Sequence, residues 1–553
     1  FFLSEDAIEG SSGYYRPLTY ISFALEQAIW GKNPAGYHCT NLLLHILVTM
    51  LFYAVTAALF KKERLALIAA LVFALHPVAG ESVNFLSGGR NTLLSACFGL
   101  LSFLFYIRQK NRAALVSFSF AIFSKEFALL LPAIFMFYDL RLQREKLRLS
   151  RYLPFLIPIA AYLSLRAYVV QKANFLASMN LADAMAAPYL VARYVLNMLL
   201  PLQLKLLYSI NPTTTSGIIC LAILGILAAA IYYFRAPNEI LFSAFWVLLF
   251  LLPVINIIPL HTTTVMADRY AYFSLMGFSL LLATLICTLS ERHMMAGAAV
   301  LCAAYAFVDF RHNGFWKNEV IFFTRMTQDA PERFEGYKNL GLYHYKNGDI
   351  DRAILNLEAA DAKPGIPVKF LIGDAYIFWK ENRLEQAEKT LLRVVDLNPS
   401  NPEPYLLLMM IYEQRGDESA AQLYRNKLRN LVDGIDEIMT NRTIELCRAG
   451  ETYLSKRQYT DAEVYLWQAL RINPAFIPAL IDMGSLKSER GDLAGAITYL
   501  TKAIALEPSN RSAHYNLAMV YRMQGRSAEA QQELARFTEM EAGVQQKKGS
   551  PSR

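Results

Sequence analysis

Three short segments within the largely apolar first 310 residues bring together residue types that could do chemistry. The first segment, 76–90, contains His76, Glu81 and Arg90. A carboxylate can act as a base or a metal ligand, and an arginine can hold a phosphate group through paired hydrogen bonds. We therefore predict Glu81 as a catalytic carboxylate and Arg90 as a phosphate ligand, with His76 as a further site residue.

The second segment consists of Lys125 and Glu126, which follow Ser124 inside an apolar stretch. Ionisable residues at membrane depth are costly and are candidates for function. On this basis Lys125 is a candidate phosphate ligand and Glu126 a candidate catalytic carboxylate. The alternative is that the two side chains neutralise each other or extend to the membrane interface.

The third segment contains Asp268, Arg269 and Tyr270 at the head of another apolar stretch. Arg269 is predicted as a phosphate ligand and Asp268 as a site residue. An aspartate at this position can instead be an ordinary helix cap. The sequence leaves both interpretations of Asp268 open.

Two further candidates lie near the amino end. Arg16 follows Tyr14 and Tyr15, and His45 lies within an apolar stretch. We predict Arg16 as a phosphate ligand and His45 as a site residue. Alternatively, the aromatic residues beside Arg16 mark only the membrane interface, where tyrosine is enriched.

The elements that must position these residues are membrane helices. Hydrophobic residues make up 55% of the chain, with 31 Tyr and 34 Phe. Residues 113–138 lie between two basic loops, so we predict two short helices that meet at Ser124, Lys125 and Glu126. Other stretches long enough to cross a bilayer occur at 39–60, 65–79, 91–107, 151–170, 217–234, 239–260, 268–289 and 294–310. Residues 1–310 are therefore predicted to form a polytopic helical bundle.

The distribution of basic residues predicts the orientation of this bundle. The net charge is +8, and its basic clusters lie in short loops at 61–64, 108–112 and 141–151. Such loops face the cytosol, so the charge does not indicate binding to nucleic acid. The stretch 188–207 is ambiguous because Arg193, Pro201 and Lys205 interrupt it. If 188–207 is a re-entrant or interfacial helix, ten spans remain and the carboxyl-terminal half lies on the exoplasmic side. If 188–207 is an eleventh span, that half lies in the cytosol.

The carboxyl-terminal half repeats every 34 residues. Gly484 and Ala518 share one small position of the repeat, and Ala496 and Ala530 share a second. This spacing is typical of tetratricopeptide repeats, which stack into a solenoid with a concave surface that binds peptides. We predict a linker at 311–333, six repeats at 334–544 with a phase break at 436–442, and a disordered tail at 545–553.

The six cysteines and the first residues carry little chemical information. The cysteines have no paired spacing for zinc or disulfides, so we expect buried small hydrophobic side chains. The chain begins at Phe1 with a segment predicted to lie outside the membrane. We therefore expect a further membrane span upstream of this sequence.

Several segments together resemble one enzyme family. In order along the chain they are YYRPLTYISFALEQAIWGKNPAGYHCTNLLLH, FALHPVAGESVNFLSGGRNTLLSACFGLLSF, FSKEFALLLPAIFMFYDL, ADRYAY and FWKNEV. They resemble the transmembrane and tetratricopeptide-repeat O-mannosyltransferases and their bacterial relatives. That family is similar to the GT-C glycosyltransferases, which move a sugar from a polyprenyl-phosphate donor on the exoplasmic side of a membrane.

The resemblance implies a reaction and its partners. A carboxylate removes the proton of a protein hydroxyl, which attacks the anomeric carbon of a mannose-like hexose while the lipid phosphate leaves. Arginine, lysine or a divalent cation such as Mg or Mn stabilises that phosphate. GT-C glycosyltransferases keep an acidic pair just after their first span, and that span and its loop are expected upstream of this sequence. The principal catalytic carboxylate is then either upstream as well or Asp6, which is a third catalytic candidate. The repeats would bind the protein acceptor or a partner. They are expected on the periplasmic or ER-lumenal side, and a bacterial inner membrane is the favoured location.

Two other classes of function are compatible with parts of the sequence. A noncatalytic membrane scaffold could use the repeats to recruit partners. A transporter would be expected to show duplicated sets of spans and polar residues along a path through the bundle. No duplication is evident, and the polar candidates cluster at one rim, so the sequence favours a glycosyltransferase.

Overall fold

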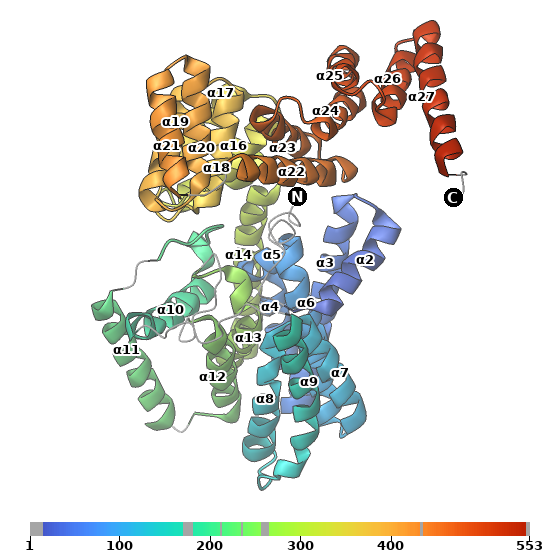
Figure 1. The fold of residues 1–553 in the computed structure, drawn as a ribbon. Coiled ribbons are helices and arrows are strands. Elements are labelled where there is room, and N and C mark those ends of the chain that lie inside the picture. The colour runs from blue at the N-terminus through green and yellow to red at the C-terminus, as the bar shows by residue number, and fades with distance from the viewer. Residues whose placement is uncertain are drawn as a thin grey trace. The chain divides into compact units, whose positions relative to one another are not determined.

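A computed structural model of the chain describes residues 15–169, 181–210, 213–233, 236–255, 265–431 and 435–548. Within these ranges the secondary structure is helical and contains no strand, so the predicted all-α fold class is confirmed (Figure 1). The chain divides into two compact units, Phe1–Glu332 and Arg333–Arg553.

The first unit is a bundle of apolar helices. Its core is rich in aromatic side chains; the ring of Phe103, for example, stacks on the rings of Phe135 and Phe242. Short 3-10 segments join several helices, namely η1 (Pro77–Ala79), η2 (Glu126–Leu130), η5 (Pro201–Gln203), η7 (Asp268–Ala271) and η8 (Gly314–Trp316). The helices are α2 (Pro17–Trp30), α3 (Pro34–Phe60), α4 (Glu63–Leu75), α5 (Gly80–Asn84), α6 (Leu86–Ile107), α7 (Asn111–Ser124), α8 (Leu131–Phe137), α9 (Leu153–Val169), α10 (Leu181–Leu199), α11 (Thr214–Tyr233), α12 (Asn238–Leu251), α13 (Tyr272–Ile286), α14 (Glu291–Asn313) and α15 (Glu319–Asp329).

The described residues contain fewer full-length spans than the ten predicted. Four helical segments are long and apolar enough to cross a membrane: Pro34–Phe60, Leu86–Ile107, Asp268–Ile286 and Glu291–Trp316. Glu63–Leu75 and Pro77–Asn84 form a fifth if this pair, bent by 55°, is one span. The bend lies at Pro77, which lacks an N–H group and disfavours a helical conformation at His76. These spans make the chain an integral membrane protein.

The segment between Gly80 and Arg90, which connects the predicted spans 65–79 and 91–107, is largely helical. Residues 80–84 form α5, and α6 already begins at Leu86. A Cβ atom at Gly89 would lie 2.0 Å from the carbonyl oxygen of Ser82, so only glycine lets the two helices approach this closely. The glycines therefore serve helix packing and not a flexible loop.

Two other predicted boundaries differ from the structure in part. The stretch 188–207 is divided, because α10 ends at Leu199 and η5 follows after one residue. The predicted linker at 311–333 contains the end of α14, η8 and α15. Its residues up to Glu332 belong to the first unit. There the Asp329 carboxylate accepts a hydrogen bond from the Leu206 backbone N–H at 2.9 Å, and the Asp329 carbonyl accepts one from Lys205 Nζ at 3.0 Å.

The second unit consists of helical hairpins in the predicted register. A Cβ atom at Gly341 would lie 2.8 Å from Leu357 Cγ, and one at Gly484 would lie 2.6 Å from Leu500 Cγ. The small positions are therefore points of helix contact. The six hairpins of the described residues are α16 (Glu335–Lys346) with α17 (Ile350–Asp361), α18 (Val368–Lys380) with α19 (Leu384–Leu397), α20 (Pro402–Arg415) with α21 (Glu418–Leu431), α22 (Ile435–Ser455) with α23 (Tyr459–Ile472), α24 (Ile477–Glu489) with α25 (Leu493–Leu506), and α26 (Arg511–Met523) with α27 (Ser527–Lys548).

Two irregular parts of the repeat array have simple explanations. The phase break at 436–442 lies inside α22, which has 21 residues where the first helix of the next hairpin has 13. At the carboxyl end, α27 extends to Lys548, four residues into the predicted disordered tail. Residues 549–553 of that tail lie outside the described residues.

Candidate functional site

Lys125 is the centre of the candidate site in the first unit. Helix α7 ends at Ser124, and the backbone at Lys125 is extended (φ −158°, ψ 139°). Only 2% of Lys125 is exposed; its Nζ donates a hydrogen bond to Thr92 Oγ1 at 2.7 Å and lies 4.5 Å from the centre of the Phe127 ring. Among the described residues, no carboxylate forms an ion pair with this ammonium group. A buried cation without a counter-ion is unfavourable, and a bound anion would relieve that cost.

Two arginine–glutamate pairs flank Lys125. Arg16 binds Glu126 through two hydrogen bonds, Nη2 to Oε1 at 2.6 Å and Nε to Oε2 at 3.1 Å. Arg269 pairs with Glu81 through its guanidinium, and its backbone N–H donates to Glu81 Oε2 at 2.8 Å. The two pairs bring Arg16, Glu81, Glu126 and Arg269 within electrostatic range of Lys125. Glu126 is thus paired with Arg16, and direct pairing with Lys125 is not observed.

Asp268 and Tyr270 connect the site to α13. The Tyr270 ring lies 5.7 Å from Lys125 Nζ and 4.9 Å from the guanidinium carbon of Arg269. Asp268 is buried and accepts hydrogen bonds from Tyr208 Oη at 2.9 Å and from Asn197 Nδ2 at 3.3 Å. The cap residue of η7 is Ala267, so Asp268 is not a helix cap.

Arg90 lies in a different environment from the one predicted. It is fully buried and forms an ion pair with Glu26 at 2.7 Å. Its Nε donates to Asn41 Oδ1 at 2.6 Å, and its Nη2 donates to the Tyr37 carbonyl at 3.1 Å. Because these partners belong to α2 and α3, Arg90 fastens both helices to α6. In the described part of the chain, none of the other predicted site residues is among its hydrogen-bond or ion-pair partners.

His45 and His76 line a groove of about 470 Å³ on the same unit. Its walls come from α3, from the segment α4–η1–α5, and from α14. Both ring nitrogens of each histidine contact the protein. His45 contacts Tyr272 Oη at 2.7 Å and the Ala74 carbonyl at 3.2 Å. His76 contacts the Met198 carbonyl at 2.7 Å and the Val78 backbone N–H at 3.2 Å. His45 therefore joins the α3 wall to the α4 wall, and His76 fastens its own segment to α10.

A chain of polar side chains crosses one end of the groove. Asn84 Nδ2 donates to Asn313 Oδ1 at 2.6 Å, and Asn313 Nδ2 donates to Asp309 Oδ2 at 2.9 Å. The other carboxylate oxygen, Asp309 Oδ1, is buried and has no hydrogen-bond partner in the described part of the chain. A Cβ at Gly80 would lie 2.9 Å from this oxygen, so glycine leaves room for it. The groove thus contains an unused hydrogen-bond acceptor.

The remaining predictions concern a metal ion and Asp6. The described residues contain no group of three His, Cys, Asp or Glu side chains that could hold a metal ion. Glu81 and Glu126 are both engaged by arginine, so the residues present do not fit a divalent cation in this conformation. Asp6 lies outside the described residues.

Sequence reasoning missed three polar residues near these sites, Thr92, Asp309 and Asn313. Asp309 and Asn313 are four residues apart on α14, which places them on one face of the helix. That spacing was the available signal, but a single pair at this spacing is common on helix surfaces. Thr92 gave no signal, because its role depends on the position of Lys125, which follows another helix, α7.

Comparisons with known proteins agree with both halves of the chain. Tetratricopeptide repeat models match residues 367–401 and 488–544. Protein O-mannosyl-transferase TMTC3 of Homo sapiens is 24% identical over 93% of this chain and 60% of its own length. Protein O-mannosyl-transferase TMTC2 of Mus musculus is 43% identical over 18% of this chain and 12% of its own. Among solved structures, MamA matches 32% of this chain and 97% of its own at 20% identity, with a TM-score of 0.19.

The chain spans about 60% of the length of the TMTC3 relative that it matches. The similarity nevertheless extends over nearly all of this chain, and the repeats are matched independently. The chain is therefore similar to the transmembrane and tetratricopeptide-repeat O-mannosyltransferase family, as its sequence predicts.

Proposed function

We propose that the protein transfers a mannose-like hexose from a polyprenyl-phosphate donor to a hydroxyl group of a protein. The observation that carries this proposal is the buried Lys125 ammonium, which lacks a carboxylate partner among the described residues and lies between two arginine–glutamate pairs. Such a position suits a phosphate that becomes more negative as the sugar leaves. The names of the relatives support a mannosyl group and a protein acceptor.

The transfer step follows from the residue types at the site. The acceptor oxygen forms a bond to the anomeric carbon, and the bond between that carbon and the phosphate oxygen breaks. The electron pair of the broken bond leaves with the lipid phosphate, whose charge Lys125 and Arg269 stabilise. Glu81 accepts the proton of the acceptor hydroxyl. Arg16, through Glu126, positions the segment that carries Lys125.

The groove is the proposed binding place for the sugar ring. Its volume of about 470 Å³ lies within the range of small-molecule sites. Asp309 Oδ1 can accept a hydrogen bond from a sugar hydroxyl, which would satisfy this buried oxygen. Gly80 lines the groove, and Glu81, the next residue of α5, belongs to the charged site, so this short helix borders both.

The location and the partners complete the proposal. The lipid bilayer holds the donor beside the first unit, and the repeats bind the protein acceptor, which raises its concentration near the site. The proposed orientation places the repeats on the exoplasmic side, as the basic loops indicate. A bacterial inner membrane remains the favoured location.

A transfer assay with purified protein tests the proposal. Polyprenyl-phosphate mannose and a protein acceptor are supplied to the wild type and to Glu81→Gln, and product is measured by mass spectrometry. We expect the variant to lose activity by about a hundredfold or more, because it cannot accept the proton. Asp351→Asn, whose side chain is 90% exposed in the repeats, is the control. Absence of transfer by the wild type, with acceptor binding retained, would favour the scaffold alternative.

A further inference from the structure

The fourth hairpin of the repeat unit packs in an unusual place. In a regular array each hairpin stacks on the preceding one, and one face of the array stays open for ligands. Here α23, the second helix of hairpin four, packs against α18, the first helix of hairpin two. It also reaches α16 and α20, which are the first helices of hairpins one and three. We call the surface that α23 covers the front face and define it by Lys346, Trp379, Lys380 and Gln414.

An aromatic and amide cluster forms the centre of this contact. The rings of Trp379 and Trp467 meet edge to face with centres 5.1 Å apart. The Arg471 guanidinium lies 4.5 Å from the centre of the Trp379 ring. Gln414 Oε1 accepts hydrogen bonds from Trp379 Nε1 at 2.8 Å and from Arg471 Nη2 at 2.6 Å. The front face and α23 are therefore joined both by ring contacts and through a shared amide oxygen.

Charge complementarity extends the contact toward the start of α23. Asp461 lies 3.7 Å from Lys346, and Glu463 lies 3.7 Å from Lys380. Burial lowers the pKa of Lys380, which shows that its charge is only partly compensated. Lys346 is about half exposed, and pairs of this kind contribute at most about 1 kcal/mol. The front face is thus basic and aromatic, and its ion pairs with α23 are weak.

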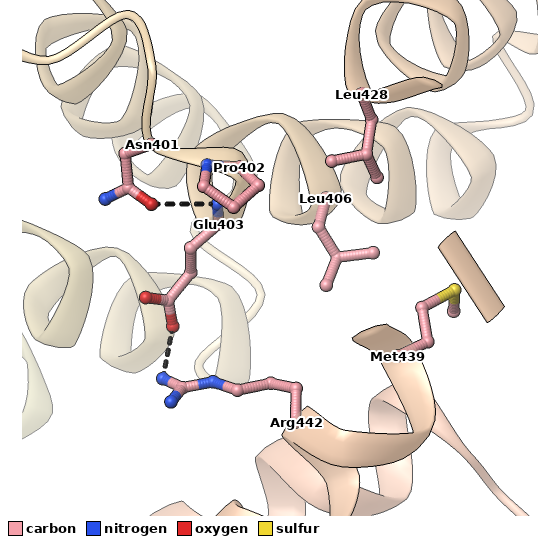
Figure 2. A pocket seen from close by; sticks show the side chains of 7 residues that line it. All are labelled: Asn401, Pro402, Glu403, Leu406, Leu428, Met439 and Arg442. Atoms are coloured by element: carbon pink, nitrogen blue, oxygen red, sulfur yellow. Dashed lines mark hydrogen bonds and ion pairs between the residues drawn. The ribbon is translucent and has the colours of Figure 1, made fainter. Parts of the chain in front are cut away.

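The junction between hairpins three and four is incompletely packed. A cavity of about 170 Å³ lies between α20, α21 and α22. Its lining includes Leu406, Leu428 and Met439 (Figure 2). An ion pair between Arg442 and Glu403 lies at its edge (Figure 2). Helix α22 has eight residues more than α24, which lengthens it by about 12 Å. That extra length carries α23 away from a regular stack and onto the front face.

We propose that the front face is a binding surface for a helical segment of a partner protein and that α23 occupies it as an internal competitor. The residues of α23 that contact the front face indicate which side chains the partner segment needs. Glu463, Trp467 and Arg471 are spaced four residues apart, so they share one side of α23. The partner segment carries a carboxylate four residues before a tryptophan and a basic residue four residues after it. This inference does not depend on the transferase activity.

The two sides of the Trp379–Trp467 contact provide a matched test. The probe is a fluorescent peptide with the sequence of residues 456–474, and its binding to the full-length protein in detergent is measured by anisotropy. Trp467→Ala loosens the internal helix and leaves the front face intact, so we expect the peptide to bind about tenfold more tightly than to the wild type. Trp379→Ala removes the ring from the front face itself. We therefore expect the peptide to bind the Trp379→Ala protein at least about tenfold more weakly than the Trp467→Ala protein.

Two controls keep the test decisive. The first control is Gln414→Ala, which changes an exposed residue of the front face. Combined with Trp467→Ala, it should lower the affinity for the peptide. This control still tests the front face if Trp379→Ala disturbs folding. A peptide with alanine in place of its tryptophan should bind none of the variants tightly. Equal peptide affinity in the wild type and Trp467→Ala, or undiminished affinity after the Gln414→Ala change, would overturn the proposal.

Discussion

Asp309 has the least complete hydrogen bonding of the groove residues, because one of its carboxylate oxygens is buried without a partner in the described part of the chain. The other oxygen, Oδ2, accepts a hydrogen bond from Asn313 Nδ2. In Asp309→Asn the amide oxygen would keep the hydrogen bond from Asn313. The amide NH2 group, a hydrogen-bond donor, would then face the groove in place of the acceptor Oδ1. The substitution thus changes the chemistry at the groove with little change of shape.

We expect Asp309→Asn to weaken binding of polyprenyl-phosphate mannose by about tenfold or more, because a hydrogen bond to a charged acceptor is lost. Binding of polyprenyl phosphate without a sugar should not change. Equilibrium binding of both lipids to the same protein preparations separates the two effects. Equal weakening for both lipids would mean that the groove does not hold the sugar.

The residue types of the site could be predicted from the sequence, but their partners could not. Charged residues in apolar surroundings singled out Lys125, Glu126 and Arg269 as candidates. The partners of Arg90 on α2 and α3 gave no signal in the sequence, and neither did the close approach of α6 to Ser82 that Gly89 permits. Whether Lys125 pairs with Glu126 depends on the extended backbone at Lys125, which sequence neighbours do not determine.

At the scale of single elements, a buried pair of carboxyl groups joins α17 and α18. Asp361 and Asp374 are both buried; Thr390 donates to Asp361 at 2.8 Å, and Lys338 pairs with Asp374. Burial and the nearby charge of Asp374 raise the pKa of Asp361 to about 8. In the unfolded chain an aspartate has a pKa of about 3.9. The folded state therefore holds a proton that the unfolded state releases.

This difference predicts that the repeat unit loses stability as pH rises from about 4 to about 8. Below that window Asp361 is protonated in both states, and above it the folded state must hold an unfavourable charge. Asp361→Asn should flatten the profile. Hydrogen-exchange protection of α17 and α18 at pH 6 and pH 9, corrected for intrinsic rates, measures the change. Identical pH profiles for wild type and variant would contradict this account.

The helical hairpins were predictable because their contacts are local and periodic. Ala496 is fully buried, and so are the alanines at the same position of four other repeats, Ala353, Ala387, Ala421 and Ala462. The packing of α23 on α18 was not predictable, since it joins residues far apart in the sequence, such as Trp379 and Trp467, and follows no repeat. The phase break at 436–442 indicated an irregularity but not its structural consequence.

At the scale of the whole molecule, the side of the membrane that carries the repeats is a prediction from the basic loops. Glu489 is exposed at the end of α24 and suits a single labelling site. Among the native cysteines Cys39 is exposed, so Glu489→Cys should be made in a Cys39→Ser background. We expect a membrane-impermeant thiol reagent to label this protein in intact cells or spheroplasts. Labelling only after lysis would place the repeats in the cytosol and make 188–207 a true span.

The central claim is that the Lys125 ammonium binds the phosphate of a lipid-linked sugar. The direct measurement is the affinity of purified protein for polyprenyl phosphate, compared between wild type, Lys125→Gln and Lys62→Gln. Lys62 is the control because its side chain is 61% exposed and already paired with Glu239. We predict that Lys125→Gln weakens binding by about tenfold to a hundredfold, the value of a charge-assisted hydrogen bond, while Lys62→Gln binds as the wild type does. Unchanged affinity in Lys125→Gln would contradict the account.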